Sequence, residues 1–111
     1  MGITRGDIVV VATRGQYSGK PRPALVVQAD VFNDTHSSLT VCPITSDTIE
    51  APLFRVDISA DSKTGLRVRS QVMVDKVVSV PRASLAKTIG HCERAELKAV
   101  DEAIRRWLDL D

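Results

Sequence analysis

Short apolar runs separated by turn residues constrain the fold of this chain more than any other feature of its sequence. Each run is rich in Val, Ile and Leu and is bounded by Gly, Pro, Asn, Asp or Ser. The runs cover residues 7–12, 24–29, 39–44 and 53–58. Side chains of this type favour strands, and the bounding residues favour turns. The first half of the chain is therefore predicted to be a series of short β-strands.

A longer alternating pattern follows at residues 66–80. Apolar or small residues occupy every second position, and the positions between them are Arg67, Arg69, Gln71, Met73 and Asp75. Because successive side chains of a strand point to opposite faces, the pattern predicts a strand pair on which the arginines, the glutamine and the aspartate share one face. Pro81 ends this strand, and residues 81–87 are predicted to form a short helical turn.

The spacing of apolar residues changes to a helical period at residues 93–110. Leu, Val, Ala, Ile and Trp recur there every three or four positions, which predicts an amphipathic helix. A chain of 111 residues is long enough for one core and too short for two. We therefore predict a single domain, residues 1–111, of mainly β (α+β) class, in which a curled antiparallel sheet packs against a C-terminal helix.

Charge is unevenly distributed along the chain, although the net charge is only +1. Residues 62–90 contain six basic side chains and one acidic side chain, Asp75. A stripe of this kind either holds a phosphate backbone or is simply a solvated face. Aromatic residues make up only 4% of the chain, which argues against a surface of stacked rings for binding bases.

Several classes of protein lose support from the sequence. No apolar run is long enough to cross a membrane, and the first residues lack a signal-peptide core, so a cytoplasmic protein with no membrane partner is predicted. Cys42 and Cys92 stand in no CxxC or histidine-rich context and are interpreted as packing thiols. His36 and His91 are interpreted as surface or capping residues. With no nucleotide-binding glycine motif, no paired metal ligands and no obvious triad, neither a metal nor a cofactor is expected.

Five sequence blocks carry a resemblance to a known family. The blocks are Arg5-Gly6-Asp7-Ile8-Val9, Lys20-Pro21-Arg22-Pro23-Ala24-Leu25-Val26-Val27, Cys42-Pro43-Ile44-Thr45-Ser46, Ser70-Gln71-Val72-Met73-Val74-Asp75-Lys76 and Ile89-Gly90. In this order and spacing they resemble the MazF/PemK (Kid) family of toxins over nearly the whole chain. The resemblance implies an SH3-like antiparallel β-barrel with a short helical turn and a C-terminal α-helix, as in the CcdB/MazF fold.

The same resemblance implies an enzymatic function. Family members are endoribonucleases that cut single-stranded RNA without a metal ion: the 2′-hydroxyl of the substrate attacks the adjacent phosphate and leaves a 2′,3′-cyclic phosphate and a 5′-hydroxyl. Such an enzyme needs a proton acceptor, positive charge for the phosphorane and a donor for the leaving oxygen. The resemblance also implies a homodimer with RNA across the subunit interface, and a cognate antitoxin whose disordered tail covers that site.

Three residues stand at the positions that the resemblance assigns to catalysis: Arg22, Thr45 and Asp75. Arg22 has a permanently charged fork suited to phosphate, Thr45 presents a hydroxyl at the end of a strand, and Asp75 matches a proton acceptor of some members. The residues expected to bind RNA are Tyr17, Lys20, Ser46, Arg67, Arg69, Gln71 and Lys76.

Structural alternatives stay open for the three catalytic candidates. Arg22 could instead pair with Asp7 and pin the proline-rich turn, and Thr45 could only stabilise a turn. Asp75 could form a plain ion pair with Arg67 or Arg69 on the predicted strand face.

The chain departs from the family pattern at several positions. Met73 stands where some members have an arginine, and Val78-Ser79 stands where many have Arg-Thr. A histidine found in the first loop of some members is missing, and Tyr17 lies in that region. These departures leave the general acid and base open, and Tyr17 either replaces a lost polar group or contacts a base or a partner.

Two other functions are compatible with the sequence. One is a non-enzymatic toxin resembling CcdB, which shares the fold and binds DNA gyrase; this alternative depends on the apolar tip Trp107-Leu108-Asp109-Leu110-Asp111. The other is a catalytically inactive, RNA-binding homologue that has lost activity through the changes at Met73 and Val78.

Overall fold

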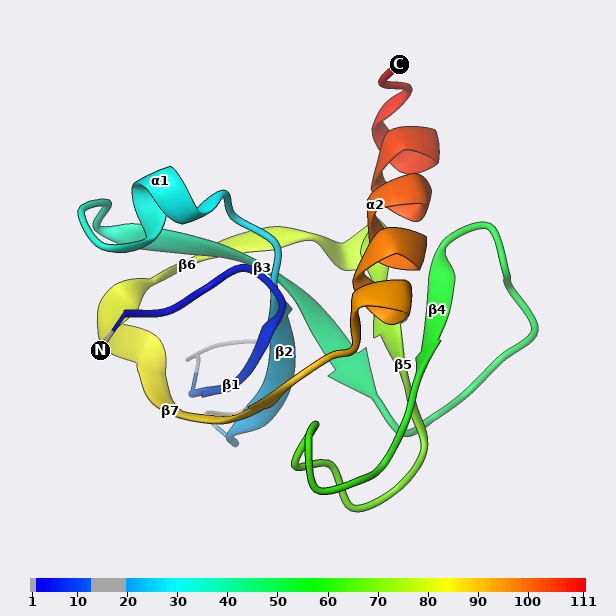
Figure 1. Cartoon of the computed structure of the whole chain (residues 1–111), viewed down its shortest axis with the longest axis horizontal. Helices are drawn as coiled ribbons and strands as arrows, with labels where there is room; N and C mark the ends of the chain where they lie inside the picture. The colour runs from blue at the N-terminus through cyan, green and yellow to red at the C-terminus, as the bar shows by residue number, and fades with distance from the viewer. Residues whose placement is uncertain (1, 13–19) are drawn as a thin grey trace.

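A strongly curved antiparallel sheet forms most of the computed structural model, which describes residues 2–12 and 20–111 (Figure 1). In those residues the strands are β1 (Asp7–Val11), β2 (Arg22–Val26), β3 (Ser38–Thr45), β4 (Arg55–Ile58), β5 (Ser70–Met73), β6 (Val78–Pro81) and β7 (Leu85–His91). The helices are α1 (Asp30–Asn33) and α2 (Arg94–Leu108), and two 3-10 turns are η1 (Val74–Lys76) and η2 (Arg82–Ser84). None of these helices is long and apolar enough to cross a membrane. The predicted mainly β class with a C-terminal helix is confirmed.

Strand β3 is the centre of the sheet. The hydrogen-bonded order is β4-β5-β3-β2-β1-β7, and β6 also pairs with β3. Strands β6 and β5 both pair with β3, with β6 opposite its first half and β5 opposite its end. Within residues 2–12 and 20–111, no ladder joins β7 to β6 or to β4. The sheet therefore curls without closing into a complete barrel.

The predicted continuous pattern over residues 66–80 is interrupted, and the expectation of one unbroken period is wrong. Val41 of β3 pairs with Val78, and Ile44 pairs with Val72. Two residues of β3 therefore face five residues of the partner segment, and the three extra residues leave the ladder as the turn η1.

The turn η1 separates side chains that were predicted to share a strand face. Arg67 and Arg69 precede β5, Gln71 lies within β5, and Asp75 lies in η1. The common face predicted for these residues does not exist, because only Ser70–Met73 has strand geometry.

Residues 81–87 form a helical turn only in η2, and β7 begins directly after it. In the ladder of β7 with β1 the register shifts twice, between Ile8 and Val9 and between Val10 and Val11. Each shift of this kind bends a strand and interrupts the alternation of its side chains. The two shifts explain why this segment lacks the sequence pattern of a strand and was predicted to be helical.

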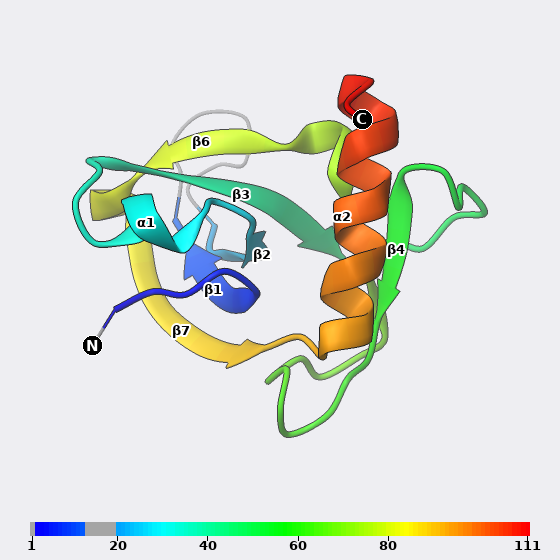
Figure 2. The ribbon, with the colours of Figure 1, turned by 45° about the horizontal axis from the view of Figure 1, so that its top comes forward.

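The sheet packs on both of its faces. One core cluster includes residues of α2 and consists of Ile8, Leu25, Cys42, Ile44, Val56, Ile58, Val72, Val74, Cys92, Val100 and Ala103. The other fills the inside of the curl and consists of Val9, Val11, Ala24, Val26, Leu39, Val41 and Val80. Figure 2 shows α2 beside β4, outside the curl of β1, β6 and β7. Neighbouring residues such as Leu25 and Val26 serve different clusters because strand side chains alternate.

Helix α2 begins one residue after the start of the predicted segment 93–110 and ends two residues before its end. A capping box stabilises its start: the Glu96 carboxylate accepts the Glu93 N–H at 2.9 Å, and the Glu93 side chain accepts the Glu96 N–H. At the other end, the Trp107 and Phe54 rings lie 5.9 Å apart, which ties the helix to the segment before β4.

Candidate functional site

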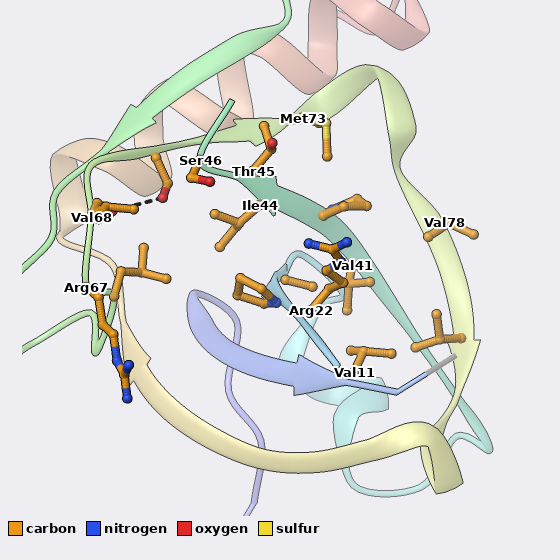
Figure 3. A pocket seen from close by; sticks show the side chains of 16 residues that line it. Val11, Arg22, Val41, Ile44, Thr45, Ser46, Arg67, Val68, Met73 and Val78 are labelled. Atoms are coloured by element: carbon orange, nitrogen blue, oxygen red, sulfur yellow. Dashed lines mark hydrogen bonds between the residues drawn. The ribbon is translucent and has the colours of Figure 1, made fainter. Parts of the chain in front are cut away.

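An apolar cleft of about 450 Å³ opens where the inside of the curl reaches the surface (Figure 3). Its floor consists of Val11, Ala24, Val41 and Val80, which belong to the core cluster inside the curl. The other lining residues are Arg22, Pro23, Pro43, Ile44, Thr45, Ser46, Leu66, Arg67, Val68, Ser70, Met73 and Val78. The fold thus brings together four predicted site residues from three separate parts of the sequence: Arg22, Thr45 with Ser46, and Arg67.

Arg22 begins β2 at the edge of this cleft. Its backbone pairs with Val11, whereas Asp7 lies at the other end of β1. The Asp7 carboxylate accepts hydrogen bonds from the Thr4 N–H and the Thr4 hydroxyl, both at 3.0 Å. The alternative pairing of Arg22 with Asp7 is therefore wrong. Among the described residues no carboxylate forms an ion pair with Arg22, and its exposed guanidinium reaches over the cleft (Figure 3).

Thr45 and Ser46 lie where β3 ends. The Thr45 hydroxyl accepts a hydrogen bond from the Asp47 N–H at 3.0 Å, so the turn-stabilising role that was left open is present. A hydroxyl that accepts one bond keeps its own hydrogen for another. Because Thr45 also lies opposite Gln71 in the ladder with β5, its backbone is fixed. Thr45 can therefore hold the turn and donate to an anion in the cleft.

Arg67 lies on the loop between β4 and β5, with Leu66 and Val68 beside it in the cleft wall. Figure 3 shows this loop on the side of the cleft opposite Met73 and Val78. The Arg67 side chain is exposed, and no carboxylate of the described residues forms an ion pair with it. The charged residues that line the described cleft are both arginines. The Arg22 guanidinium lies over the apolar floor, and the Arg67 side chain extends outward from the wall (Figure 3).

Gln71 is bonded to protein groups instead of facing the cleft. The residue is buried, and its Oε1 accepts hydrogen bonds from the Ile49 N–H at 3.0 Å and from Arg55 Nη1 at 2.9 Å. Its Nε2 donates to the Ile49 carbonyl and to Asp57 Oδ1, both at 3.0 Å. These four bonds use the full capacity of an amide. Gln71 therefore fastens the segment after β3 to β4.

The Arg69 side chain pairs with a carboxylate of β4. Its Nη2 lies 2.9 Å from Asp57 Oδ2, in an ion pair on the surface. The pKa of Asp57 is lowered, first by the hydrogen bond from Gln71 and then by the hydrogen bond and charge of Arg69, while burial opposes both. The carboxylate that pairs with Arg69 is thus that of Asp57, and the alternative ion pair of Arg69 with Asp75 is wrong.

The other predicted site residues do not line the cleft. Asp75 is half-buried in η1, which packs against α2, β3 and β4, and its Oδ1 is buried with no hydrogen-bond partner among the described residues. The alternative ion pair of Asp75 with Arg67 is also missing from this part of the chain. Lys20 and Lys76 are exposed. Tyr17 lies outside the described residues.

Two departures from the family pattern, Met73 and Val78, are part of the cleft wall. They place apolar side chains where arginines stand in some members, which leaves the positive charge of the described cleft on Arg22 and Arg67. The apolar lining residues Leu66 and Val68 were missed by sequence reasoning. The alternating pattern assigned them to a buried strand face, and nothing in it marks a face that stays open.

Thiols and metal ligands do not contribute to the described cleft. Cys42 and Cys92 are buried and unpaired. Burial raises the pKa of Cys42 to about 12 and the pKa of Cys92 to about 11. The interpretation of both cysteines as packing thiols is confirmed. In residues 2–12 and 20–111, no group of three or more His, Cys, Asp or Glu side chains could hold a metal ion.

Comparison with known proteins reveals close relatives of the chain. The sequence profile of a family described as "PemK-like, MazF-like toxin of type II toxin-antitoxin system" matches residues 4–108. A curated protein of Mycolicibacterium smegmatis, "Probable endoribonuclease MazF", is 42% identical over 106 residues, which cover 96% of each chain. The solved structure of the Mycobacterium tuberculosis toxin MazF-mt6 has a TM-score of 0.80 at 28% identity and covers 95% of this chain and 98% of that one. A mycobacterial endoribonuclease solved in complex with its cognate antitoxin shares the fold, with a TM-score of 0.82 at 16% identity over 98% of this chain and 97% of that one.

Proposed function

The chain belongs to the family of PemK-like, MazF-like toxins of type II toxin–antitoxin systems, and we propose that it is a sequence-specific endoribonuclease that cuts single-stranded RNA without a metal ion. The name of the relative from Mycolicibacterium smegmatis supports the activity. The observation in this chain that carries the proposal is the exposed Arg22 guanidinium, which shares an apolar cleft with the Thr45 hydroxyl and has no ion-pair partner among the described residues.

In the proposed reaction the substrate supplies its own nucleophile. The 2′-oxygen forms a bond to the adjacent phosphorus while the bond from phosphorus to the 5′-oxygen breaks. The 2′-hydroxyl gives its proton to a base, and the leaving 5′-oxygen takes a proton from an acid, so the products are a 2′,3′-cyclic phosphate and a 5′-hydroxyl. The phosphorane between them carries extra negative charge on its non-bridging oxygens, and fixed donors aimed at these oxygens lower the barrier.

The cleft residues fit the needs of such a phosphorane. The forked guanidinium of Arg22 can donate two parallel hydrogen bonds to two phosphate oxygens. The Thr45 hydroxyl donates to a phosphate oxygen while it holds the turn at Asp47. Arg67 neutralises a neighbouring phosphate from the opposite wall, and Ser46 offers a further hydroxyl next to Thr45.

Proton transfer requires a group from beyond this lining, because no carboxylate or imidazole lines the described cleft. We assign the proton acceptor to Asp75, because it matches the position of a proton acceptor in some members of the family. In the proposed homodimer the RNA crosses the subunit interface and extends beyond one cleft. Lys20 and Lys76 are both exposed and would bind phosphates on this longer path, together with Tyr17 as a contact to a base or sugar.

The family description also supports a protein partner and a site of action. We propose that a cognate antitoxin, acting with this toxin in the cytoplasm, inhibits it by covering the cleft with a disordered tail. Positive charge over an apolar floor suits a tail that combines acidic and apolar side chains.

A second candidate function is favoured by the exposed apolar end of α2. Trp107 and Leu108 are about half exposed, at 49% and 50%, and Leu110 is 57% exposed. A non-enzymatic toxin of the CcdB kind would bind DNA gyrase through such a tip. This candidate predicts inhibition of supercoiling with no cleavage of RNA.

The decisive experiment for the first proposal is incubation of the purified protein with a long single-stranded RNA in excess EDTA. Primer extension would map the ends, and an all-deoxy strand of the same sequence would test the need for the 2′-hydroxyl. Wild-type protein should cut at discrete positions and leave 5′-hydroxyl ends, whereas Arg22→Ala should cut about 100-fold more slowly. The all-deoxy strand should stay intact.

A matched control tests whether the loss of any one positive charge, wherever it lies, is enough to reduce cleavage. Arg94 is exposed at the start of α2, away from the described cleft, so Arg94→Ala should cut RNA like the wild type. A folded wild-type protein that cuts no RNA would contradict the nuclease proposal. Inhibition of gyrase in a supercoiling assay would then favour the second candidate, and RNA binding without cleavage would indicate an inactive homologue.

A further inference from the structure

The loop from residue 59 to residue 66 lies against β7 with backbone touching backbone. The His91 N–H donates to the Lys63 carbonyl at 2.8 Å. A Cβ at Gly90 would overlap the carbonyl groups of Lys63 and Thr64, and a Cβ at Gly65 would overlap the Ile89 carbonyl. Gly65 also has a φ of +73°, which side-chain-bearing residues rarely adopt. The two segments therefore approach more closely than any residue other than glycine allows.

Thr64 stabilises this loop from within through the hydrogen bonds of its hydroxyl. Its side chain is completely buried. The Thr64 hydroxyl donates to the Ser59 carbonyl at 2.8 Å and accepts from the Asp61 N–H and the Leu66 N–H, both at 3.2 Å. Removing this hydroxyl while keeping the volume of the side chain would leave buried backbone groups without partners, which is strongly unfavourable. One hydroxyl thus fixes both ends of the loop.

The segment that leaves this loop carries the positive wall of the cleft. Leu66, Arg67 and Val68 line the cleft directly after Thr64 and Gly65. On the far side of the segment, the buried Ser70 hydroxyl donates to the Val68 carbonyl at 2.9 Å (Figure 3). The backbone of Arg67 is therefore held on both sides, although its side chain is exposed.

We propose that Thr64 and Gly90 are positioning residues that hold Arg67 at the distance required to bind an RNA phosphate in the cleft. This inference rests on the proposed nuclease function. A long arginine side chain binds a phosphate well only if its backbone starts from a fixed point, because a displacement of about 1 Å is enough to weaken binding and catalysis. Thr64 fixes that point within the loop. Gly90 has no side chain, so the loop can pack directly against the backbone of β7.

The first experiment compares Thr64→Val with Thr64→Ser in the cleavage assay. Valine has the volume of threonine but no hydroxyl, whereas serine keeps the hydroxyl. We expect Thr64→Val to raise KM about fivefold with little change in kcat, and Thr64→Ser to change KM less than about twofold. A valine variant with an unchanged KM, or a serine variant as impaired as the valine variant, would overturn the inference.

A double-mutant cycle with Arg67→Ala separates positioning from general stability. Arg67→Ala alone should raise KM about tenfold, since a charge-assisted contact to phosphate is lost. If Thr64 acts through Arg67, then Thr64→Val should have no further effect on KM in the Arg67→Ala background. Independent, multiplying effects of the two substitutions would contradict the inference and leave the nuclease proposal intact.

A measurement without RNA tests the loop directly. In amide hydrogen exchange, the Leu66 and His91 amides should lose protection in Thr64→Val and in Gly90→Ala, while the amides of α2 keep theirs. Unchanged protection at Leu66 and His91 would overturn the inference even if the variants fold poorly in other respects. Wild-type protein that cuts no RNA would contradict the proposed function, so the two failures are distinguishable.

Discussion

The two faces of the sheet are built from the same strands, yet one is covered and the other opens to the surface. In β3, Cys42 packs in the cluster beneath α2, whereas its neighbour Val41 forms part of the cleft floor. The covered face is sealed by α2, which is 15 residues long. The open face ends in a cleft with Arg22 and Arg67 at its edge. The alternation of strand side chains thus assigns stability to one face and binding to the other.

The largest effect that would test this division is expected at Arg22. We expect Arg22→Ala to lower the rate of RNA cleavage about 100-fold, because a preorganised donor to the phosphorane is lost. The melting temperature should stay within about 2 °C of the wild type, since surface changes alter stability little. Cleavage kinetics and thermal unfolding would be measured on the same samples. Arg22→Lys keeps the positive charge but loses the forked guanidinium, so its cleavage rate should lie between those of the wild type and Arg22→Ala.

A change on the covered face should have the opposite pattern. Val100 of α2 is 1% exposed, so Val100→Ala leaves a cavity beneath the helix. We expect a loss of about 2 kcal/mol in the free energy of unfolding and a melting temperature lower by ~10 °C. At a temperature where the variant is folded, kcat for RNA should equal that of the wild type. A parallel fall in kcat would show that the two faces are coupled.

The buried thiol of Cys42 gives a smaller, pH-dependent test of the covered face. Its pKa is raised from 9.0 to about 12, so between these values an unfolded chain ionises the thiol and the folded chain does not. The stabilising effect is complete below pH 9 and is lost as the pH rises, by about 1 kcal/mol at pH 10. Urea unfolding at pH 8 and pH 10 should show a smaller pH dependence in Cys42→Ala than in the wild type. If stability depended on pH equally in Cys42→Ala and the wild type, the result would mean that water reaches Cys42.

The smallest effect is expected at Asp57, which is bonded to Gln71 at the edge of the sheet. Its lowered pKa means that the ionised carboxylate stabilises the fold above about pH 4, and that this stabilisation is lost as the pH falls through the folded-state pKa. Because Asp57 is exposed, Asp57→Asn should lower the free energy of unfolding by less than about 1 kcal/mol at pH 7. The difference between the urea midpoints of variant and wild type should shrink as the pH is lowered from 7 to 3. A difference that does not shrink would assign the effect to lost packing.

Much of the fold followed from local patterns in the sequence. The strands β1 to β4 follow short apolar runs bounded by turn residues, and the helix α2 follows a helical period of apolar residues. Each forms within a few residues of its predicted position. Strand β7 was missed because its two register shifts with β1 disrupt the alternation. The turn η1 was missed because three extra residues opposite β3 are a property of pairing between distant strands, which a local pattern does not contain.

The candidate site could be predicted only in part from the sequence. The resemblance pointed to Arg22 and Thr45, and the fold brings both to one cleft with Arg67. Gln71 was expected to bind RNA because alternation placed it on a polar face. Alternation cannot tell whether such a face is open. The segment with Ile49 covers Gln71 and makes two of its four hydrogen bonds, and β4 makes the other two. Burial of this kind depends on a loop whose path is set by tertiary contacts.

The ladder between β1 and β7 joins segments that are far apart in the sequence, because Asp7 lies opposite His91. During synthesis β1 leaves the ribosome long before its partner strand exists. Contacts so distant in sequence form late and slow the folding of a small domain. Val11, in the floor of the cleft, is held by this ladder. A nascent chain therefore lacks a finished cleft until β7 has been translated.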